Sequence, residues 1–227
     1  MSASTAIIVF ARAPQAGLVK TRLIPALGEQ GALTLYRAML RHALSTARQC
    51  APDELVLSRT PHSPDCELRA MARAADATLR VQCGADLGAR MHHALRSALQ
   101  THDVALLLGS DCPSLRRADL DDARDRLLEA AMNESVSTSR PRTDLVFIPA
   151  TDGGYVLVGA SRPCEEIFHG LPWGSSEVMK MTRQRMRAAQ RKWQELPAHS
   201  DIDRPEDLAL LRRERPPREL PAPSRAR

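Results

Sequence analysis

The sequence predicts an α/β fold in which a single doubly wound, mostly parallel mixed sheet is flanked by helices. Short apolar runs such as Val104–Leu108 are typical of strands that are buried on both faces of a parallel sheet. Between these runs, segments such as 30–49 carry apolar residues at the spacing of an amphipathic helix. Strands that alternate with helices favour parallel pairing, with helices packed on both faces of the sheet.

The same periodicities give the expected elements one by one. We expect strands over Thr5–Ala11, Glu54–Ser58, Thr78–Val81, Val104–Leu108, Leu145–Pro149, Gly154–Gly159 and Gln194–Leu196. We expect helices over 30–49, 64–75, 86–100, 116–131, 175–189 and 204–213. The tight turn Asp152-Gly153-Gly154 between two strands predicts a hairpin, and therefore an antiparallel member of the sheet. Residues 133–144 are polar, and we expect them to be irregular.

The positive charge of the chain is concentrated near its C-terminal end. The whole chain carries a net charge of +5, and residues 212–227 supply +4 of it through six Arg and two Glu. This Pro- and Arg-rich composition predicts that residues 214–227 form a solvated, disordered basic tail after a single domain over residues 1–213. Contact of the tail with nucleic acid or a membrane is the alternative. Aromatic residues make up only 3% of the chain, which argues against base-stacking platforms for nucleic acid.

Cysteine usage and apolar patterning predict a cytoplasmic protein. The five cysteines are scattered and form no CxxC pair, so neither a disulfide framework nor a structural zinc site is expected. The first apolar run, Ala6–Phe10, is too short for a signal sequence and lacks a basic lead. No apolar run approaches the ~18 residues of a membrane-spanning helix. We therefore expect a reducing compartment and no membrane span, and the oligomeric state stays open.

The loop after the first predicted strand is suited to the phosphates of a nucleotide. Gly17 permits close approach of the backbone to a ligand. Arg12, Lys20 and Arg22 place three cations beside it. The loop is neither a Walker A loop nor GxGxxG. An ordinary surface loop with solvated cations is the alternative.

A second candidate segment precedes the helix predicted over 86–100. The amide of Gln82 is suited to hydrogen bonding with a base or a ribose, and Gly84 allows the backbone to lie close to a ligand. Asp86 is also a natural N-cap residue for this helix. Capping is therefore the alternative explanation of the segment.

The turn Gly109-Ser110-Asp111 directly follows the apolar strand Val104–Leu108. Open α/β sheets bind ligands at the carboxyl ends of their strands. Asp111 is therefore well placed to hold Mg²⁺ or Mn²⁺ against the phosphates of a ligand. Capping of the next helix by Asp111 or Ser114 is the alternative.

The hairpin turn and a later tryptophan are candidates for binding an acceptor. A hairpin turn does not require two successive glycines, Gly153 and Gly154, followed by Tyr155. The two glycines leave room for an acceptor beside Asp152. Trp173 would supply an apolar wall for a sugar ring, with core packing as the alternative.

Two further carboxylates, Asp201 and Asp203, lie near the end of the predicted domain. Capping of the helix that begins near Pro205 explains Asp203 well. It explains Asp201 poorly, so Asp201 is a candidate for another role.

Five segments of the chain together resemble one protein family. They are FARAPxxGxVKTRL, QxGxDLGxRM, GSDCPSL, PATDGGYxLVG and DIDRPEDL, in this order. They resemble the glycosyltransferase-A-like proteins of the DUF2064 family, some of which are assigned to arsenosugar biosynthesis. The resemblance spans about residues 6–211. The wider superfamily contains nucleotide-sugar-dependent glycosyltransferases and nucleotidylyltransferases, so the resemblance implies a nucleotide-diphospho-sugar transferase fold.

The resemblance also implies roles for individual residues. Asp111 matches the metal-binding carboxylate that follows the central strand, and Asp201, with Asp203 as the fallback, matches a second metal ligand near the C-terminus. Gln82 and Gly84 match the segment near the base and the ribose. The nucleotide-binding residues expected are Phe10, Ala11, Arg12, Gly17, Lys20, Arg22, Gln82, Gly84 and Asp111.

These roles leave three functions open. In the first, a metal-dependent glycosyltransferase moves a sugar from a nucleotide sugar to a small-molecule acceptor. Lys20 and Arg22 then stabilise charge on the leaving group, and Asp152 orients or deprotonates the acceptor hydroxyl. In the second, a nucleotidylyltransferase releases pyrophosphate; the segment Lys20-Thr21-Arg22-Leu23 resembles Lys-Ser-Arg-Leu of the 2-phospholactate guanylyltransferases. The third is a non-catalytic nucleotide-binding domain.

Overall fold

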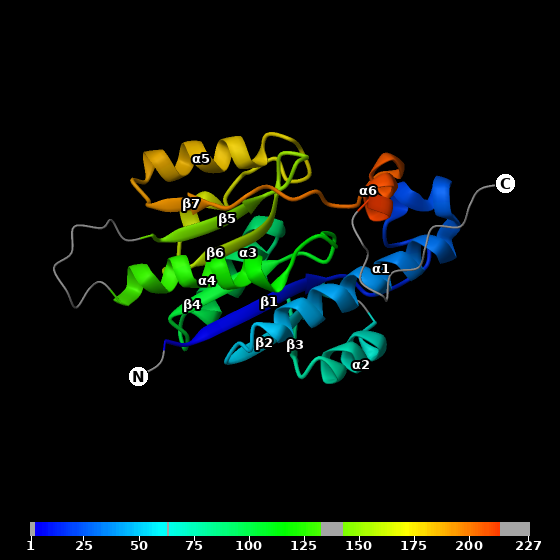
Figure 1. The fold of residues 1–227 in the computed structure, drawn as a ribbon, viewed down its shortest axis with the longest axis horizontal. Coiled ribbons are helices and arrows are strands. Elements are labelled where there is room, and N and C mark those ends of the chain that lie inside the picture. Colours follow the sequence, from blue (N-terminus) through cyan, green and yellow to red (C-terminus); the bar gives the residue numbers. More distant parts are fainter. Residues whose placement is uncertain (1–2, 63, 133–142, 214–227) are drawn as a thin grey trace.

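The structure, a computed structural model, describes residues 3–62, 64–132 and 143–213 (Figure 1). Its centre is a seven-stranded sheet with the strand order β3-β2-β1-β4-β6-β5-β7. The strands are β1 (Thr5–Ala11), β2 (Glu54–Arg59), β3 (Thr78–Val81), β4 (Val104–Leu108), β5 (Leu145–Pro149), β6 (Tyr155–Ala160) and β7 (Trp193–Glu195). Each lies where the sequence pattern predicts a strand, to within a residue at either end.

Strand β6 runs antiparallel to both of its neighbours, whereas every other strand pair is parallel. The hairpin from β5 to β6 accounts for this reversal and confirms the predicted mixed sheet. The chain leaves β1 toward β2 and β3 on one side and then places β4 on the other side of β1. The strand order therefore reverses between β1 and β4, which is the point where open α/β sheets bind ligands.

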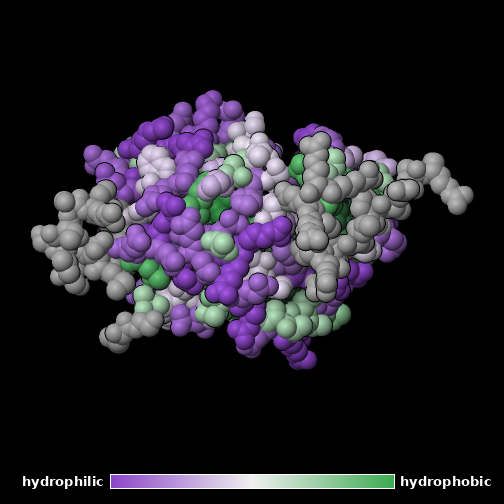
Figure 2. Space-filling model, in the orientation of Figure 1, coloured by the Kyte–Doolittle hydropathy of each residue, from purple (hydrophilic) through white to green (hydrophobic). Residues whose placement is uncertain are grey.

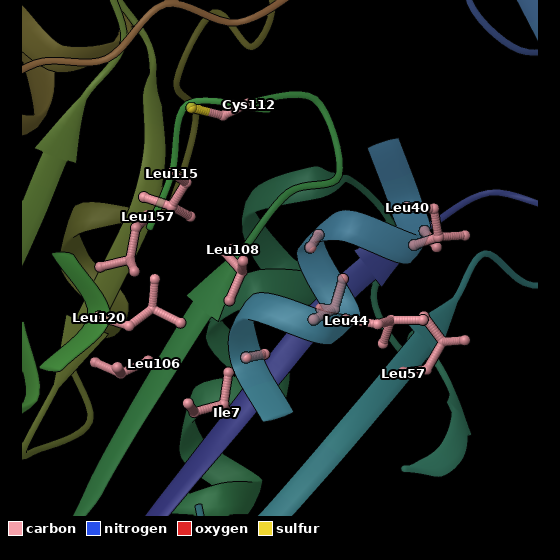
Figure 3. Close-up of a cluster of buried hydrophobic side chains, with 14 of the residues drawn as sticks. Ile7, Leu40, Leu44, Leu57, Leu106, Leu108, Cys112, Leu115, Leu120 and Leu157 are labelled. Carbon is pink, nitrogen blue, oxygen red and sulfur yellow. The ribbon is translucent and has the colours of Figure 1, made fainter. Parts of the chain in front are cut away.

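Helices cover both faces of the sheet. The α-helices are α1 (Ile24–Gln49), α2 (Cys66–Ala74), α3 (Leu87–Ala98), α4 (Arg117–Met132), α5 (Val178–Ala188) and α6 (Leu208–Arg213), with short 3-10 helices at Thr21–Leu23, Glu165–Ile167 and Pro205–Asp207. Helices α1, α2 and α4 pack on one face, around Ile7, Leu106 and Leu157 (Figure 3). Helices α3 and α5 cover the other face, around Phe147 and Phe168. Burial on both faces explains why the central strands are continuous apolar runs.

A smaller apolar cluster joins the start of α1 to the C-terminal segment. Leu23 and Met39 pack with Ile202 and Leu211 in this cluster. Gly28 adopts φ 69° and interrupts the helical conformation near the start of α1. In Figure 1, α6 lies beside this part of α1, on the side to which the carboxyl ends of β1 and β4 point. The cluster therefore holds the C-terminal segment near the carboxyl ends of β1 and β4.

The face of the molecule shown in Figure 2 is mainly hydrophilic. The large apolar side chains that stand exposed among the described residues are Leu18, Val81 and Leu87. None of the described helices has the length and apolar character that crossing a membrane requires.

The largest differences from the predicted helix boundaries are in α1, in α5, which begins at Val178 and not at residue 175, and in the C-terminal helix. Helix α1 begins at Ile24, ahead of the predicted residue 30, because Pro25 is compatible with the first turn of a helix. The non-helical Gly28 breaks it, so its uninterrupted part starts close to the predicted residue. The helix expected over 204–213 is divided into a 3-10 turn at Pro205–Asp207 and α6. Residues 133–142 of the polar stretch and the predicted tail over 214–227 lie outside the described residues.

Gly88, in the first turn of α3, provides a test of how this helix packs. A Cβ at this position would lie 2.2 Å from the carbonyl oxygen of Phe168 and 2.9 Å from a ring carbon of Trp173. We expect Gly88→Ala to lower the free energy of unfolding by about 2 kcal/mol, because the backbone at Phe168 has to move. Urea-induced unfolding measures this loss.

Gly109→Ala is the control for this substitution, because a Cβ there meets no atom of the described residues within 4 Å. We expect it to change the free energy of unfolding by less than about 0.5 kcal/mol. Equal losses in the two variants would contradict the close packing of α3 against Phe168.

Candidate functional site

A cleft of about 550 Å³ opens where the strand order reverses between β1 and β4. The predicted residues that line it are Phe10, Ala11, Arg12, Lys20, Arg22, Gln82, Asp111 and Asp203. They come from the end of β1 and its loop, the residue after β3, the loop after β4 and the C-terminal segment. The fold gathers them because the carboxyl ends of parallel strands share one edge of the sheet.

Tyr36 fixes the start of the loop after β1. Its hydroxyl accepts a hydrogen bond of 2.8 Å from Arg12 N and donates one of 2.9 Å to Arg12 O. Burial and the nearby negative charge of Asp111 raise the pKa of this hydroxyl, so it remains protonated and able to donate. The guanidinium of Arg12 is exposed and forms no ion pair with any described residue.

Lys20 connects three parts of the site through one buried ammonium group. Its Nζ lies 3.1 Å from Asp111 Oδ2 and donates a hydrogen bond of 2.5 Å to Ile202 O. Only 3% of the side chain is exposed, and the backbone adopts φ 48°, a conformation that is strained for a residue other than glycine. Ile202 N in turn donates to Asp111 O at 2.9 Å. The loops after β1 and β4 and the C-terminal segment are therefore joined at one point.

Asp203, the fallback metal ligand, is paired with protein cations. Its Oδ2 lies 2.5 Å from Arg22 Nη1, and its Oδ1 lies 3.7 Å from Lys20 Nζ. Because both oxygens face cations, Asp203 is less suited than Asp201 to hold a metal ion. In this arrangement Lys20 and Arg22 position carboxylates, and the contact of either cation with phosphates stays a prediction.

A second cavity of about 160 Å³ adjoins the cleft. Gly109 and Asp111 line both spaces, so Asp111 stands at their junction. Asp111, Asp152 and Asp201 border the second cavity, and no Lys, Arg or His of the described chain lines it. Burial, and then the negative charges of Asp152 and Asp111, raise the pKa of Asp201 to about 6.

The carboxylates that border the second cavity suit a divalent cation, but the number of them that can bind it directly is limited. Carboxylate oxygens are the ligands that Mg²⁺ and Mn²⁺ prefer. A bound cation would relieve the repulsion that raises the pKa of Asp201. Across residues 3–62, 64–132 and 143–213, however, no three His, Cys, Asp or Glu side chains lie close enough together to hold a metal ion. The donors therefore suit a cation that takes one or two carboxylates and completes its coordination with phosphate oxygens and water.

Gly17 and Gly84 lie outside the lining of the cleft, and a positive φ accounts for the glycine at both positions, with close packing as a further reason at Gly84. Gly17 adopts φ 76° in a turn that is closed by a hydrogen bond from Leu18 N to Gln15 O. Gly84 adopts φ 142° against the start of α3, where a Cβ would lie 2.7 Å from Arg90 N. The structure therefore gives these glycines roles in shaping the loops, and their contact with a nucleotide stays a prediction.

Gln82 lines the cleft, but part of its amide is already engaged. Its Nε2 donates to Ser58 O at 2.9 Å, which leaves Oε1 as the acceptor available to a ligand. Asp86 caps α3 by accepting a hydrogen bond from Ala89 N at 2.8 Å. The capping alternative is thus confirmed for Asp86.

The turn between β5 and β6 combines one structural glycine with groups that face the second cavity. Gly153 adopts φ 95°, and a Cβ there would lie 2.2 Å from Ser176 O, so the chain before α5 excludes a side chain. Asp152 Oδ1 accepts a hydrogen bond from Gly154 N at 2.9 Å, and both residues line the second cavity. Asp152 and Gly154 therefore remain candidates for meeting an acceptor.

Tyr155 and Trp173 pack against one another beneath the turn. The ring centre of Tyr155 lies 5.2 Å from that of Phe147 and 6.2 Å from that of Trp173. Tyr155 lines the second cavity, but its buried hydroxyl has no hydrogen-bond partner among the described residues. Trp173 lines neither the cleft nor the second cavity and packs on the α3 face of the sheet, which matches the core-packing alternative.

The cleft residues that were not predicted from the sequence include Arg90 and Tyr36. Arg90 Nε donates to Gly84 O at 3.1 Å, and its guanidinium forms no ion pair within the described chain. Arg90 lies in the segment QxGxDLGxRM, which was a usable signal. The helical spacing around Tyr36 predicts a core position, and only its polar hydroxyl hints at a second role.

Solved structures define the class of this fold. A protein from Desulfovibrio desulfuricans G20, provisionally named a nucleotide-diphospho-sugar transferase, is 30% identical, with a TM-score of 0.76 over 89% of this chain and 84% of that one. A cytidylyltransferase from Leptospira borgpetersenii is 17% identical, with a TM-score of 0.56 over 91% and 84%. Glucosyl-3-phosphoglycerate synthase from Mycobacterium tuberculosis, in complex with Mn²⁺, UDP and glucosyl-3-phosphoglycerate, is 13% identical, with a TM-score of 0.51 over 95% and 81%. The chain therefore has the fold of the nucleotide-diphospho-sugar transferases.

Within this class, residues 43–175 match the family described as "Uncharacterized protein conserved in bacteria (DUF2064)". This match includes more than half of the chain and confirms the resemblance that the five motifs indicate. The chain belongs to the DUF2064 family. A search of the curated proteins found no match.

The different burial of Lys20 and Arg22 gives a prediction for stability. We expect Lys20→Met to lower the free energy of unfolding by about 2 kcal/mol, because it removes charged hydrogen bonds from a buried position. Arg22→Met should cost less than about 1 kcal/mol, because 58% of the Arg22 side chain is exposed and its ion pair is screened by water. Urea-induced unfolding compares the two variants, and equal losses would contradict the anchoring role of Lys20.

The raised pKa of Asp201 gives a prediction for the metal-free protein. Between pH 4 and 6 the folded state binds more protons at this group than the unfolded state, whose carboxyl has a pKa of 3.8, so stability falls as pH rises through this window. We expect Asp201→Asn to raise the free energy of unfolding at pH 8 by about 1 kcal/mol and to have no such effect near pH 3.5. Chemical unfolding in the presence of a chelator measures the difference. A variant that is less stable than wild type at pH 8 would contradict the repulsion among these carboxylates.

Proposed function

We propose that this protein is a metal-dependent glycosyltransferase that uses a nucleotide-sugar donor and a small-molecule acceptor. The observation that carries the proposal is the position of Asp111 at the junction of two spaces of different character. The cleft on one side offers guanidinium groups that form no ion pair with the described residues, and the cavity on the other side is small and acidic. A transferase needs such an arrangement, because donor and acceptor have to meet at one point.

Arg12 and Arg90 are the candidates for holding the donor diphosphate. Both line the cleft, and neither guanidinium is paired with a carboxylate of the described chain. Guanidinium groups bind phosphate oxygens in a bidentate manner. The rest of the cleft supplies apolar side chains such as Leu18 and Leu87, together with the Oε1 of Gln82, for the nucleoside.

The second cavity is the candidate acceptor site. Its lining within the described chain contains no cationic side chain, so it suits a neutral hydroxyl-bearing acceptor better than a phosphorylated one. Asp152 borders this space and is positioned by its hydrogen bond from Gly154 N. We assign to Asp152 the orientation or deprotonation of the acceptor hydroxyl.

Asp111 and Asp201 are the residues that would hold Mg²⁺ or Mn²⁺. A cation bound there would neutralise charge on the leaving nucleoside diphosphate. Ser110 Oγ donates to Asp111 Oδ1 at 3.0 Å, and Lys20 binds Asp111 Oδ2, so both oxygens of this carboxylate are held in place. In this proposal, Lys20 and Arg22 act by positioning Asp111 and Asp203.

Nucleotidyl transfer is the second candidate function, because a cytidylyltransferase shares this fold. This reaction would need Lys20 and Arg22 at the triphosphate, where charge develops. In the structure these two cations are bound to Asp111 and Asp203, and this pairing supports glycosyl transfer.

The test combines binding with product analysis. We expect ADP, CDP, GDP or UDP to raise the melting temperature more with Mn²⁺ than without it, because ligands that bind the folded state stabilise it. Asp111→Asn should remove the Mn²⁺-dependent part of the shift. Nucleotide sugars with Mn²⁺ and an acceptor should release free nucleoside diphosphate.

Asp125→Asn, on the exposed side of α4, is the control and should keep the full Mn²⁺-dependent shift. Release of pyrophosphate from nucleoside triphosphates, with nucleotide sugars left intact, would replace glycosyl transfer by nucleotidyl transfer. Nucleotide binding that Mn²⁺ does not change, with no turnover of either donor, would favour a non-catalytic binding domain.

A further inference from the structure

His199 lies where the three carboxylate-bearing segments of the second cavity come together. Asp111 lies on the loop after β4, Asp152 on the turn after β5, and Asp201 on the C-terminal segment. These segments are far apart in the sequence. The separation of their carboxylates therefore depends on the contacts that join one segment to another.

The imidazole of His199 contacts the loop after β4 and the start of α4. Its Nδ1 lies 2.9 Å from Ser114 Oγ, and its Nε2 lies 3.5 Å from Asp119 Oδ1. A carboxylate beside Nε2 favours the tautomer that carries its hydrogen on that nitrogen, which leaves Nδ1 to accept the Ser114 hydroxyl. Only 17% of the His199 side chain is exposed, so water competes little for these contacts.

The backbone of His199 binds the turn after β5. His199 N donates to Pro149 O, and Thr151 N donates to His199 O, both at 3.0 Å. On the other side of Asp201, Ile202 N donates to Asp111 O at 2.9 Å. The segment that carries Asp201 is therefore hydrogen-bonded to both of the other segments.

We propose that His199 is a positioning residue that sets the separation of Asp111 and Asp201 beside the turn that carries Asp152, and thereby the affinity of this site for a divalent cation. The statement about the cation rests on the proposed function. His199 lines neither the cleft nor the second cavity, so it acts through the carboxylates and not by touching a ligand. Partners that orient metal ligands in this way typically change metal affinity about 10- to 100-fold when they are removed.

The first measurement is hydrogen exchange of the ligand-free protein. We expect His199→Ala to speed exchange of the Thr151 and Ile202 amides by about tenfold, because the hydrogen bonds that they form open more often. His199→Asn should restore slow exchange, because its amide oxygen replaces Nδ1 as the acceptor for Ser114. His102→Ala is the control, since His102 lies just before the amino end of β4, whereas the second cavity lies at the carboxyl end of that strand.

The second measurement is the affinity for Mn²⁺ in the presence of ADP, CDP, GDP and UDP in turn. We expect His199→Ala to weaken Mn²⁺ binding about tenfold or more, with nucleotide affinity in the absence of Mn²⁺ unchanged. His199→Asn should recover most of the loss. Ser114→Ala removes a single hydroxyl and should reproduce most of the effect, so the test stands even if His199→Ala folds poorly.

The outcomes separate this inference from the proposed function. Unchanged amide exchange in His199→Ala and Ser114→Ala would overturn the positioning role. Faster amide exchange with unchanged Mn²⁺ affinity would show that His199 has only a structural role, and it would also overturn the inference. Wild-type protein that binds no Mn²⁺ with any of the four diphosphates would contradict the metal-dependent function itself, whatever the exchange data show.

Discussion

The buried ammonium group of Lys20 is the interaction on which the rest of the site depends. A charge with 3% of its side chain exposed is tolerated only when its donors are satisfied, and here Asp111 and Ile202 satisfy them. The two partners lie on different segments, so the requirement for pairing also fixes the shape of the site. The strained φ of 48° at Lys20 is the cost of directing the side chain into this position.

The topology of the sheet separates two spaces that have different chemistry. The reversal of strand order between β1 and β4 opens the cleft in which Arg12 and Arg90 are paired with no carboxylate of the described residues. The antiparallel insertion of β6 beside β4 brings the Asp152 turn against the other side of Asp111. One carboxylate thus borders both a cationic and an acidic environment. This contrast supports group transfer between two bound molecules more directly than the fold alone does.

Much of the fold is predictable from the sequence because its signals are local. The apolar run Val104–Leu108 and the turn after it locate β4 and place Asp111 at the edge of the sheet. The partners of Lys20 were not predictable, because a contact with Ile202 depends on where the C-terminal segment returns. The sequence also does not distinguish a glycine needed for packing from one needed for binding a ligand. Gly84 and Gly153 are needed for close packing of the chain against itself, and close approach of a ligand would require the same residue type. His199 has no signal at all in the sequence, since its partners come together only in the folded chain.

The contact from Lys20 to Ile202 joins residues that are 182 positions apart. During synthesis, β1 to β6 and most of the helices emerge from the ribosome before Ile202 exists. Closing so long a loop is slow compared with local folding. A nascent chain can therefore build most of its core before the C-terminal segment reaches the carboxyl ends of β1 and β4, and the candidate site is assembled only after nearly the whole domain has been translated.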